Sequence, residues 1–600
     1  MNTVKGLNAP FFVKFVFMNQ LLTFFCIIAL PLMSWSQIDA TIELDSLTIN
    51  YKTGGSLDSV DRISVGFSNS FIPNFSDRNF QFIQADYFLN PEKGILFSTP
   101  KIENQLLFSA LPHIGFSYVF GTQGTQLLNF NFQQALKYNF IVNAAIKRNQ
   151  SVGFFRNSAL KNNQYDLKVG KIGKIYSVLL SGIYSNQSNA WNGGIEADSL
   201  AVIYASGLIP VRKENALSNS TSFVFNLKNH LKITGDSINF IRLNFVNQYC
   251  SQKRFYAERD SLSNLYPSIY IDSLQTNDTL TTNRSSNNLS LLLRKNGFNF
   301  EAGASFDYWN YKSFGLYRDT IEIGLFEQLS FKWKGFEIKQ HGNLNLVGAG
   351  RGFGSTTSIS FPFLKGVIAL NHFVNYCYPE LYQRHFYSNN TIYQLASLNL
   401  QKRQQLKLEV KNIIGINDFG FYYQLMNYKD NYFYDSNQFI WRNDLAISTG
   451  VLHQVSVKKS FKAKQIYFSP SYTFNGIKEK FRLIPMHQLN ARLQFKGGIF
   501  KAKKLQFACG FDVSYHSKFK NTAFIPQMAL LDLTSSTTNS FQKSLLNVSF
   551  FSSFEVETFH FFVRADNFAY FWSDKTTTII EGYTLPSLQV KIGITWDFWN

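Results

Sequence analysis

The sequence has little charge and few cysteines for a chain of 600 residues. Charged residues make up 16% of it, against about 25% in ordinary soluble domains. Cys26 lies in an early apolar stretch, and Cys250, Cys377 and Cys509 are widely spaced. Three distant cysteines exclude a disulfide framework and show no metal-type clustering. The low charge disfavours a typical water-soluble protein.

Long hydrophobic runs are also missing from most of the chain. Beyond residue 37 no run reaches 18 apolar residues, so the sequence predicts no transmembrane helix. Yet aromatic residues make up 17% of the chain, with 62 Phe and 30 Tyr. A transmembrane β-barrel reconciles these facts, because its lipid-facing residues alternate with polar lumen residues along every strand.

The N-terminal residues predict export. Lys5 and Lys14 precede an apolar stretch at 21–33, and Ser34 and Ser36 are small residues at the positions that a signal peptidase reads. We expect a signal peptide at 1–36, a polar periplasmic segment at 37–61 and a barrel at 62–600. A membrane-anchor helix is the alternative for the first segment. The apolar run is short for an anchor, and a cleavage site follows it.

The net charge of +19 would ordinarily suggest a nucleic-acid partner. Because the predicted signal peptide implies export from the cytoplasm, we expect no nucleic-acid partner. The expected partners are outer-membrane lipid and lipopolysaccharide, the barrel-assembly machinery and small hydrophilic solutes. The sequence leaves the oligomeric state open.

Alternation of apolar and polar residues recurs along the chain. Phe298, Phe300 and Phe306 alternate with polar or small residues over 298–308, a length that matches the roughly 9–11 residues of a membrane-spanning strand. The last residues show the same pattern. Their apolar set is predicted to face lipid while the strand closes the sheet against the first strand; it comprises Val590, Ile592, Ile594, Trp596 and Phe598.

Turn signals divide the chain into hairpins. Short turns are predicted at Thr234-Gly235, Asn296-Gly297, Lys334-Gly335 and Lys496–Gly498. Long polar connections are predicted at 185–217, 250–284, 309–325, 376–396, 427–438 and 517–541. The fold class is therefore all-β: a transmembrane antiparallel β-barrel of about 16–22 strands, with short periplasmic turns and long extracellular loops. For the polar stretch at 260–284, an interdomain linker is the alternative to an extracellular loop.

No motif for catalysis emerges. The nine histidines are scattered, and the sequence holds no H-E-x-x-H, G-x-S-x-G or P-loop motif. A pairing of His516 with Asp512 would be arbitrary. We expect no catalytic residues, cofactor or metal, and no enzymatic activity.

Two short stretches resemble a known family. The loop Trp191-Asn192-Gly193-Gly194-Ile195-Glu196 resembles the asparagine-glycine-glycine loop of the putative β-barrel porin family of the Bacteroidota. Upstream, residues 151–157 are also similar to that family's pattern. The resemblance implies a diffusion pore and supplies no catalytic residues.

The leading hypothesis is a passive outer-membrane channel for small hydrophilic solutes. The surplus of basic residues suggests an anion preference. The favoured interpretation, however, is that many lysines lie at turns and rims, where they only solvate the barrel or contact lipid phosphates. The alternatives are a non-conducting structural or secretion-associated barrel and a plugless relative of energised outer-membrane receptors. An outer-membrane hydrolase lacks support.

Overall fold

The computed structural model describes residues 106, 109 and 111–599, with gaps at 237, 261–264, 396–397, 413–417, 436–437, 446, 477–482, 500–503, 521, 533–543 and 573. The signal peptide predicted at 1–36 and the polar segment predicted at 37–61 lie outside the described residues. So does the start of the predicted barrel, up to residue 105. The first described strand begins at His113.

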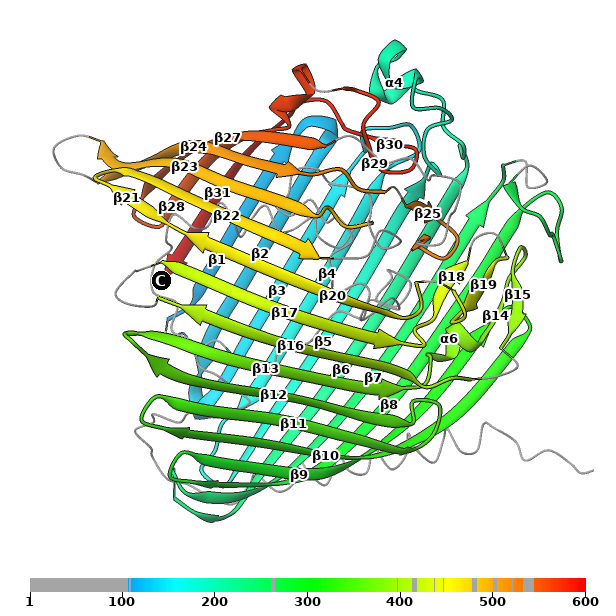
Figure 1. Cartoon of the computed structure of the whole chain (residues 1–600). Coiled ribbons are helices and arrows are strands. Elements are labelled where there is room, and N and C mark those ends of the chain that lie inside the picture. The colour runs from blue at the N-terminus through cyan, green and yellow to red at the C-terminus, as the bar shows by residue number, and fades with distance from the viewer. Residues whose placement is uncertain are drawn as a thin grey trace, which may run out of the picture. The chain divides into compact units, whose positions relative to one another are not determined.

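The described chain is a closed antiparallel β-barrel of 22 strands (Figure 1). Each strand pairs with the next along the chain, as expected for strands joined by hairpins. The barrel strands are β1 (His113–Gly121), β2 (Thr125–Leu136), β3 (Phe140–Ser151), β4 (Leu160–Lys171), β5 (Tyr176–Trp191), β6 (Ala216–Gly235), β7 (Phe240–Glu258), β8 (Thr276–Lys295), β9 (Phe298–Ser313), β10 (Leu316–Trp333), β11 (Phe336–Val347), β12 (Gly352–Phe363), β13 (Gly366–Cys377), β16 (Gln401–Lys411), β17 (Phe419–Lys429), β20 (Gly450–Lys459), β22 (Ile466–Gly476), β23 (His487–Ile499), β24 (Leu505–His516), β27 (Leu545–Val556), β28 (Phe559–Asp566) and β31 (Gln589–Trp599).

Smaller elements lie between the barrel strands. The short strand β21 (Phe461–Ala463) pairs with β22. Four small hairpins and two short α-helices gather at one end of the barrel (Figure 1): β14 (His385–Tyr387) with β15 (Ile392–Gln394), β18 (Phe433–Asp435) with β19 (Ile440–Arg442), β25 (Ala523–Ile525) with β26 (Leu530–Asp532), β29 (Thr578–Ile580) with β30 (Tyr583–Thr584), α4 (Leu200–Ile203) and α6 (Leu381–Arg384). The 3₁₀ turns are η4 (Thr122–Gly124), η5 (Lys137–Asn139), η6 (Ser206–Leu208) and η9 (Phe568–Phe571). Among the described residues, no helix is long and apolar enough to cross a membrane.

The final strand closes the barrel. β31 pairs with β28 on one side and with β1 on the other, so that Ile594 lies opposite both Phe561 and Tyr118. Closure leaves no unpaired edge, which is the condition for crossing a bilayer with strands. The strand count falls at the upper limit of the predicted range.

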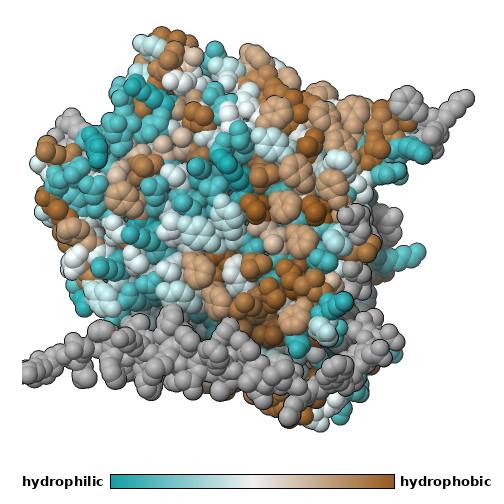
Figure 2. Space-filling model, turned by 180° about the vertical axis from the view of Figure 1, so that it is seen from behind, coloured by the Kyte–Doolittle hydropathy of each residue, from teal (hydrophilic) through white to brown (hydrophobic). Residues whose placement is uncertain are grey.

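The outer face carries its apolar residues on the half of the strands nearest the short turns. On β8, Leu289, Leu291 and Leu293 point outward and are exposed, whereas the outward positions nearer the other end are Asn283, Ser285 and Asn287. Figure 2 shows hydrophobic side chains mainly on one part of the surface and hydrophilic ones on the other. Since a tilted strand crosses a bilayer in roughly 9–11 residues, the 20-residue strand β8 extends well beyond it.

The two ends of the barrel differ as predicted. Asn296-Gly297, Lys334-Gly335 and the end of β6 at Gly235 form short turns at one end, and Asn296, Gly297, Lys334, Gly335 and Gly235 all have positive φ. The long connections lie at the opposite end, between β5 and β6, β7 and β8, β13 and β16, β17 and β20, β24 and β27, and β28 and β31. We refer to these as the short-turn end and the long-loop end.

Three predicted boundaries were wrong. Residues 309–325 form no long loop, because β9 and β10 are joined by Phe314-Gly315 alone. Much of 250–284 is strand, since β7 runs to Glu258 and β8 begins at Thr276. Lys496–Gly498 lies within β23 and is not a turn. The first two errors share a cause: the polar outer faces of strands that extend past the bilayer resemble loops in the sequence.

Candidate functional site

The long loops fold into a hydrophobic cluster at the long-loop end, which we term the loop core. The barrel wall contributes inward-facing side chains: Trp191, Ala216, Tyr256, Leu280, Tyr311, Leu316, Met426, Tyr428, Leu452 and Leu545. The connections between strands contribute Tyr382, Phe386, Tyr393, Tyr432, Phe433, Tyr434, Trp441, Ile447, Leu483, Ile484, Phe519, Phe524, Ile525, Met528, Ala529, Leu530, Ile580, Tyr583 and Leu585. All of these side chains are buried.

The loop core bridges opposite sides of the barrel. Its wall residues come from β5–β10 and also from β17, β20 and β27. In the order of pairing, β5 and β20 lie half the circumference apart. A single cluster can contact both walls only if loop side chains occupy the space between them. The mouth at the long-loop end is therefore narrowed by packed loops.

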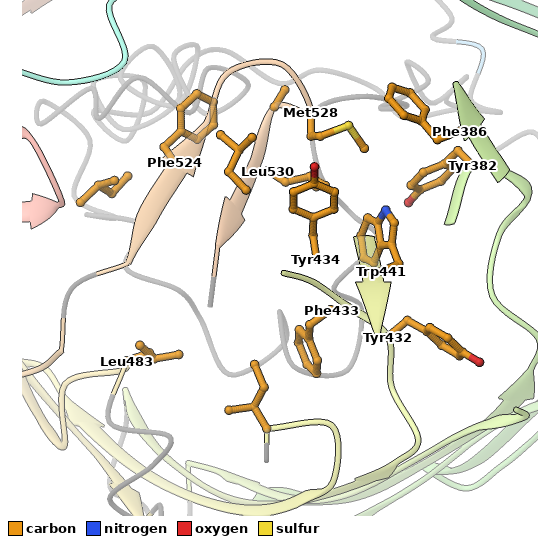
Figure 3. Close-up of a cluster of buried hydrophobic side chains, with 14 of the residues drawn as sticks. Tyr382, Phe386, Tyr432, Phe433, Tyr434, Trp441, Leu483, Phe524, Met528 and Leu530 are labelled. Atoms are coloured by element: carbon orange, nitrogen blue, oxygen red, sulfur yellow. The ribbon is translucent and has the colours of Figure 1, made fainter. Parts of the chain in front are cut away.

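Aromatic packing organises the loop core. Trp441 lies between Tyr382 and Tyr434, with both ring-centroid distances at 5.9 Å and edge-to-face geometry (Figure 3). Trp191 of the wall packs on Phe524 of β25 with centroids 5.0 Å apart. Such pairs add about 0.5–1.5 kcal/mol beyond the burial of their area. Aromatic contacts thus join two loops to each other and a third loop to the wall.

Hydrogen bonds from the wall tie the connection between β24 and β27 into the core. The buried Arg254 of β7 donates to the carbonyl oxygens of Pro526, at 2.9 Å, and Gln527. The Gln527 amide donates to Asp278 of β8 at 3.0 Å and to Ser388 at 2.9 Å. Asp278 also accepts the backbone N–H of Asn389 at 2.8 Å. One polar network therefore joins two long loops to adjacent strands.

The family-like loop lies at the rim of this end. Trp191 ends β5 and donates from its indole N–H to Ser218 at 2.7 Å. Asn192 caps the turn, because its side-chain oxygen accepts the Gly194 N–H at 2.9 Å. Gly193 and Gly194 have φ of 66° and 90°, a region that favours glycine. Ile195 is fully buried and bridges to Val211.

The two stretches that resemble the family meet in space. Asn157, from 151–157, donates to the carbonyl oxygen of Trp191 at 2.9 Å. Phe155 packs against Ile195 in a small apolar cluster. A third loop joins them, because the Ile195 N–H donates to the Gly582 carbonyl at 2.7 Å. The two motifs together build one junction between three loops.

A buried ion pair lies beside the junction. Lys213 contacts Glu258 at the end of β7, and both side chains are buried. Glu258 also accepts hydrogen bonds from Tyr256 at 2.8 Å and Tyr266 at 2.6 Å. Burial lowers the pKa of Lys213, and the neighbouring Glu258 opposes that shift. Burial also raises the pKa of Tyr266.

The closing strand carries apolar side chains outward and polar ones inward. Trp596 and Phe598 are exposed, and Val590, Ile592 and Ile594 point to the same outer side. On the inner side Lys591 lies 3.5 Å from Asp566, which also pairs with Arg564 at 2.7 Å. Arg564 also contacts Asp512 at 3.0 Å, and Arg492 contacts the same carboxylate at 2.7 Å. This ladder of ion pairs crosses β23, β24, β28 and β31 on the lumen side.

The inner wall from β10 to β20 carries accessible lysines near the short-turn end. Lys332, Lys339, Lys411 and Lys458 occupy inward positions and are exposed. Lys339 pairs with Glu337 at 3.0 Å. Lys411 contacts Glu409 at 3.3 Å and shares that carboxylate with Lys407. The accessible part of the lumen wall is therefore polar and mainly basic.

In the part of the chain that the structure describes, no group of three or more His, Cys, Asp or Glu side chains could hold a metal ion. Asp512 and His516 both lie on the inner face of β24, but Asp512 forms ion pairs with Arg492 and Arg564.

The loop core was not predicted. A signal for it exists in the sequence, since Tyr432-Phe433-Tyr434 is an aromatic run inside a connection between strands.

A closed barrel with an apolar outer band and a polar lumen is a bacterial outer-membrane protein. The chain belongs to the family described as "putative porin", which it matches over residues 107–600.

Solved structures of similar fold include a siderophore receptor and an iron transporter. The siderophore receptor PirA from Acinetobacter baumannii matches with a TM-score of 0.57 and 11% identity, covering 82% of each chain. The FrpB iron transporter from Neisseria meningitidis matches with a TM-score of 0.55 and 11% identity, covering 82% of this chain and 83% of that one. At this identity the likeness shows the fold alone. No curated protein matches the chain.

Proposed function

We propose that this protein is an outer-membrane channel for passive diffusion of small hydrophilic solutes, with a preference for anions. The observation that carries the proposal is the accessible basic wall of β10–β20. Lys339 and Lys411 have side chains that are 62% and 61% exposed while facing the lumen. Charges lining a pore set its ion preference, because a permeating ion passes them at close range.

The loop core supports a limit on solute size. Packed loops between opposite walls leave less room at the long-loop end than the 22-strand barrel itself would. Small solutes pass such a constriction more readily than large ones. The lysines at the short-turn end then select permeating solutes by their charge.

Reversal potentials across a salt gradient in a planar bilayer test the anion preference. The wild-type protein should favour anions, and a variant with K339E, K411E and K458E should lose or reverse that preference. The matched control is K137E, K334E and K464E, which changes three lysines in turns between strands. An equal change in both variants would support solvation of turns and rims, and a cation preference in the wild type would refute the anion proposal.

The loop core also favours a second candidate, a receptor-like barrel that admits solute only after a ligand moves the loops. Liposome swelling with sugars and amino acids of graded size separates the two. Size-dependent swelling supports the open channel. Absence of swelling by folded, heat-modifiable protein supports the receptor-like or structural alternative.

A further inference from the structure

We propose that the outer face of β10–β13 is an interface through which two copies of this chain pair side by side in the membrane. These four strands are neighbours in the barrel wall (Figure 1). Their lipid-facing surface carries a row of polar side chains, which we term the polar belt: Glu327, Gln340, Ser355, Thr357 and His372. Three features carry the inference, namely the orientation of the belt, its depth in the membrane and the order of its polar groups.

The belt points away from the lumen. Lys339 faces the lumen, so its neighbour Gln340 points outward. The side-chain amide of Gln340 donates a hydrogen bond to the Glu327 carboxylate at 3.0 Å, which places Glu327 on the same face. Thr357 opposes Gln340 on one side and His372 on the other. The imidazole of His372 is exposed on that outer face.

Apolar residues enclose the belt on every strand. Toward the long-loop end, the next outward residues are Leu325, Leu344, Phe353 and Val374. Toward the short-turn end, they are Leu329, Ile338, Ile359 and Leu370. The belt residues lie about four to eight positions from the short-turn ends of their strands, near the middle of the roughly 9–11 residues that span a bilayer. The belt is therefore surrounded by lipid-facing surface and does not lie at a water-exposed edge.

A polar belt at this depth is unfavourable against acyl chains. Charged side chains on the lipid face of a barrel destabilise it most at the midplane, and hydrocarbon offers polar groups no hydrogen bonds. One amide, that of Gln340, does not satisfy the roughly four acceptor sites of the Glu327 carboxylate. Side chains of a neighbouring protein supply such hydrogen bonds, which is why polar residues stabilise contacts between membrane-embedded segments.

The order of polar groups fits a second copy of the same belt. From β10 to β13 the belt reads carboxylate, amide, hydroxyl and imidazole. Glu327 and His372 are each about six positions from the short-turn ends of their strands, so they lie at similar depth. A two-fold axis along the membrane normal, between β11 and β12, then sets each carboxylate against the imidazole of the other copy.

The same axis sets the amide of Gln340 against the hydroxyl of Thr357. An imidazole N–H donates to a carboxylate, and an amide pairs with a hydroxyl, so each facing pair supplies a donor and an acceptor. A head-to-tail ring would set the belt against a different surface and lose this match. The pairing uses only the outer face, so it goes beyond the proposed channel and does not depend on conduction.

Cysteine cross-linking in outer membranes tests the pairing and keeps the belt intact. The full chain, with its mature cysteines Cys250, Cys377 and Cys509 changed to serine, carries L329C and L370C. Within one copy these outward positions are three strand spacings apart, at least about 14 Å, which is too far for a disulfide. Only a second copy can supply the partner thiol, so oxidation should give a dimer. Either single-cysteine protein should give little.

The matched control is I146C with I594C. These outward positions on β3 and β31 are also three strands apart, and the outward residues between them, Phe116 and Phe130, are apolar. This protein should stay largely monomeric after oxidation. Equal dimer from both pairs would indicate random collision and overturn the interface, as would monomer alone from L329C with L370C. A cross-linked product of another mass would assign the belt to a different protein and would also overturn the proposal.

A charge swap tests the chemistry of the contact in the L329C and L370C background. H372E sets carboxylate against carboxylate and should lower the dimer fraction at least about tenfold, because like charges facing each other across an interface cost several kcal/mol. Combining E327H with H372E restores acid opposite base and should recover the dimer. No recovery in a heat-modifiable double variant would refute the assigned contacts. Failure of the proposed channel would appear as absent conductance while this cross-linking pattern remains.

Discussion

Replacing Arg254 with methionine should release the β25–β26 hairpin from the loop core. The guanidinium makes hydrogen bonds to the carbonyl oxygens of Pro526 and Gln527, and Gln527 is 1% exposed. Hydrogen bonds to charged groups contribute about 1.5–3 kcal/mol each. Methionine keeps much of the apolar stem but removes both hydrogen bonds. The Pro526 carbonyl keeps the Ala529 N–H at 3.2 Å, whereas the Gln527 carbonyl loses the guanidinium, so we expect a loss of about 3 kcal/mol in docking free energy.

That loss corresponds to about a 100-fold larger population of the undocked loop. Amide hydrogen exchange followed by mass spectrometry on peptides covering 523–532 measures this opening directly, because local opening sets the exchange rate. The matched control is K253M, the neighbouring position on β7, whose side chain is exposed and points away from the lumen. Unchanged exchange at 523–532 in a heat-modifiable R254M barrel would refute the role assigned to Arg254.

Two further perturbations test the junction at the rim. K213M should destabilise the folded barrel by about 3–5 kcal/mol, because it leaves the fully buried Glu258 without its cation; adding E258Q should restore part of the loss, measured as the temperature at which the heat-modifiable band disappears, and no recovery would contradict the ion-pair account. Gly194→Val should cost about 1–3 kcal/mol in backbone strain and displace Gly582, whose Cα lies 3.0 Å from the added Cβ. Protease cleavage within 192–215 should rise in this variant but not in Gly207→Val, where the added group meets open space; equal cleavage would count against a built junction.

The fold could be predicted because the strands of a membrane barrel appear in the sequence as alternating apolar and polar residues. Phe306 is exposed on the outer face of β9 and Asp307 is buried on the inner face, as the pattern at 298–308 indicates. Closure was also predicted, and β31 pairs with β1 as well as with β28. The predicted lengths failed where strands leave the bilayer, because Asn283 and Asn287 face water instead of lipid and lose the alternating signal.

The loop core could not be predicted because its contacts join residues far apart in the chain. Trp441 packs on Tyr382, and Trp191 packs on Phe524. No local periodicity links such positions, and each loop is too short to bury its aromatic residues alone. An aromatic run such as Tyr432-Phe433-Tyr434 indicates burial but not the partner.

The accessible lysines of β10–β20 and the loop core lie at opposite ends of one lumen, and this makes their proposed roles separable. The lysines would set the charge preference, whereas the packed loops would set the size limit. Reversing the charge of Lys339, Lys411 and Lys458 should then change the reversal potential with little effect on the size limit measured by liposome swelling. If the variant changed the size limit as much as the reversal potential, the two roles could not be assigned to different ends of the lumen.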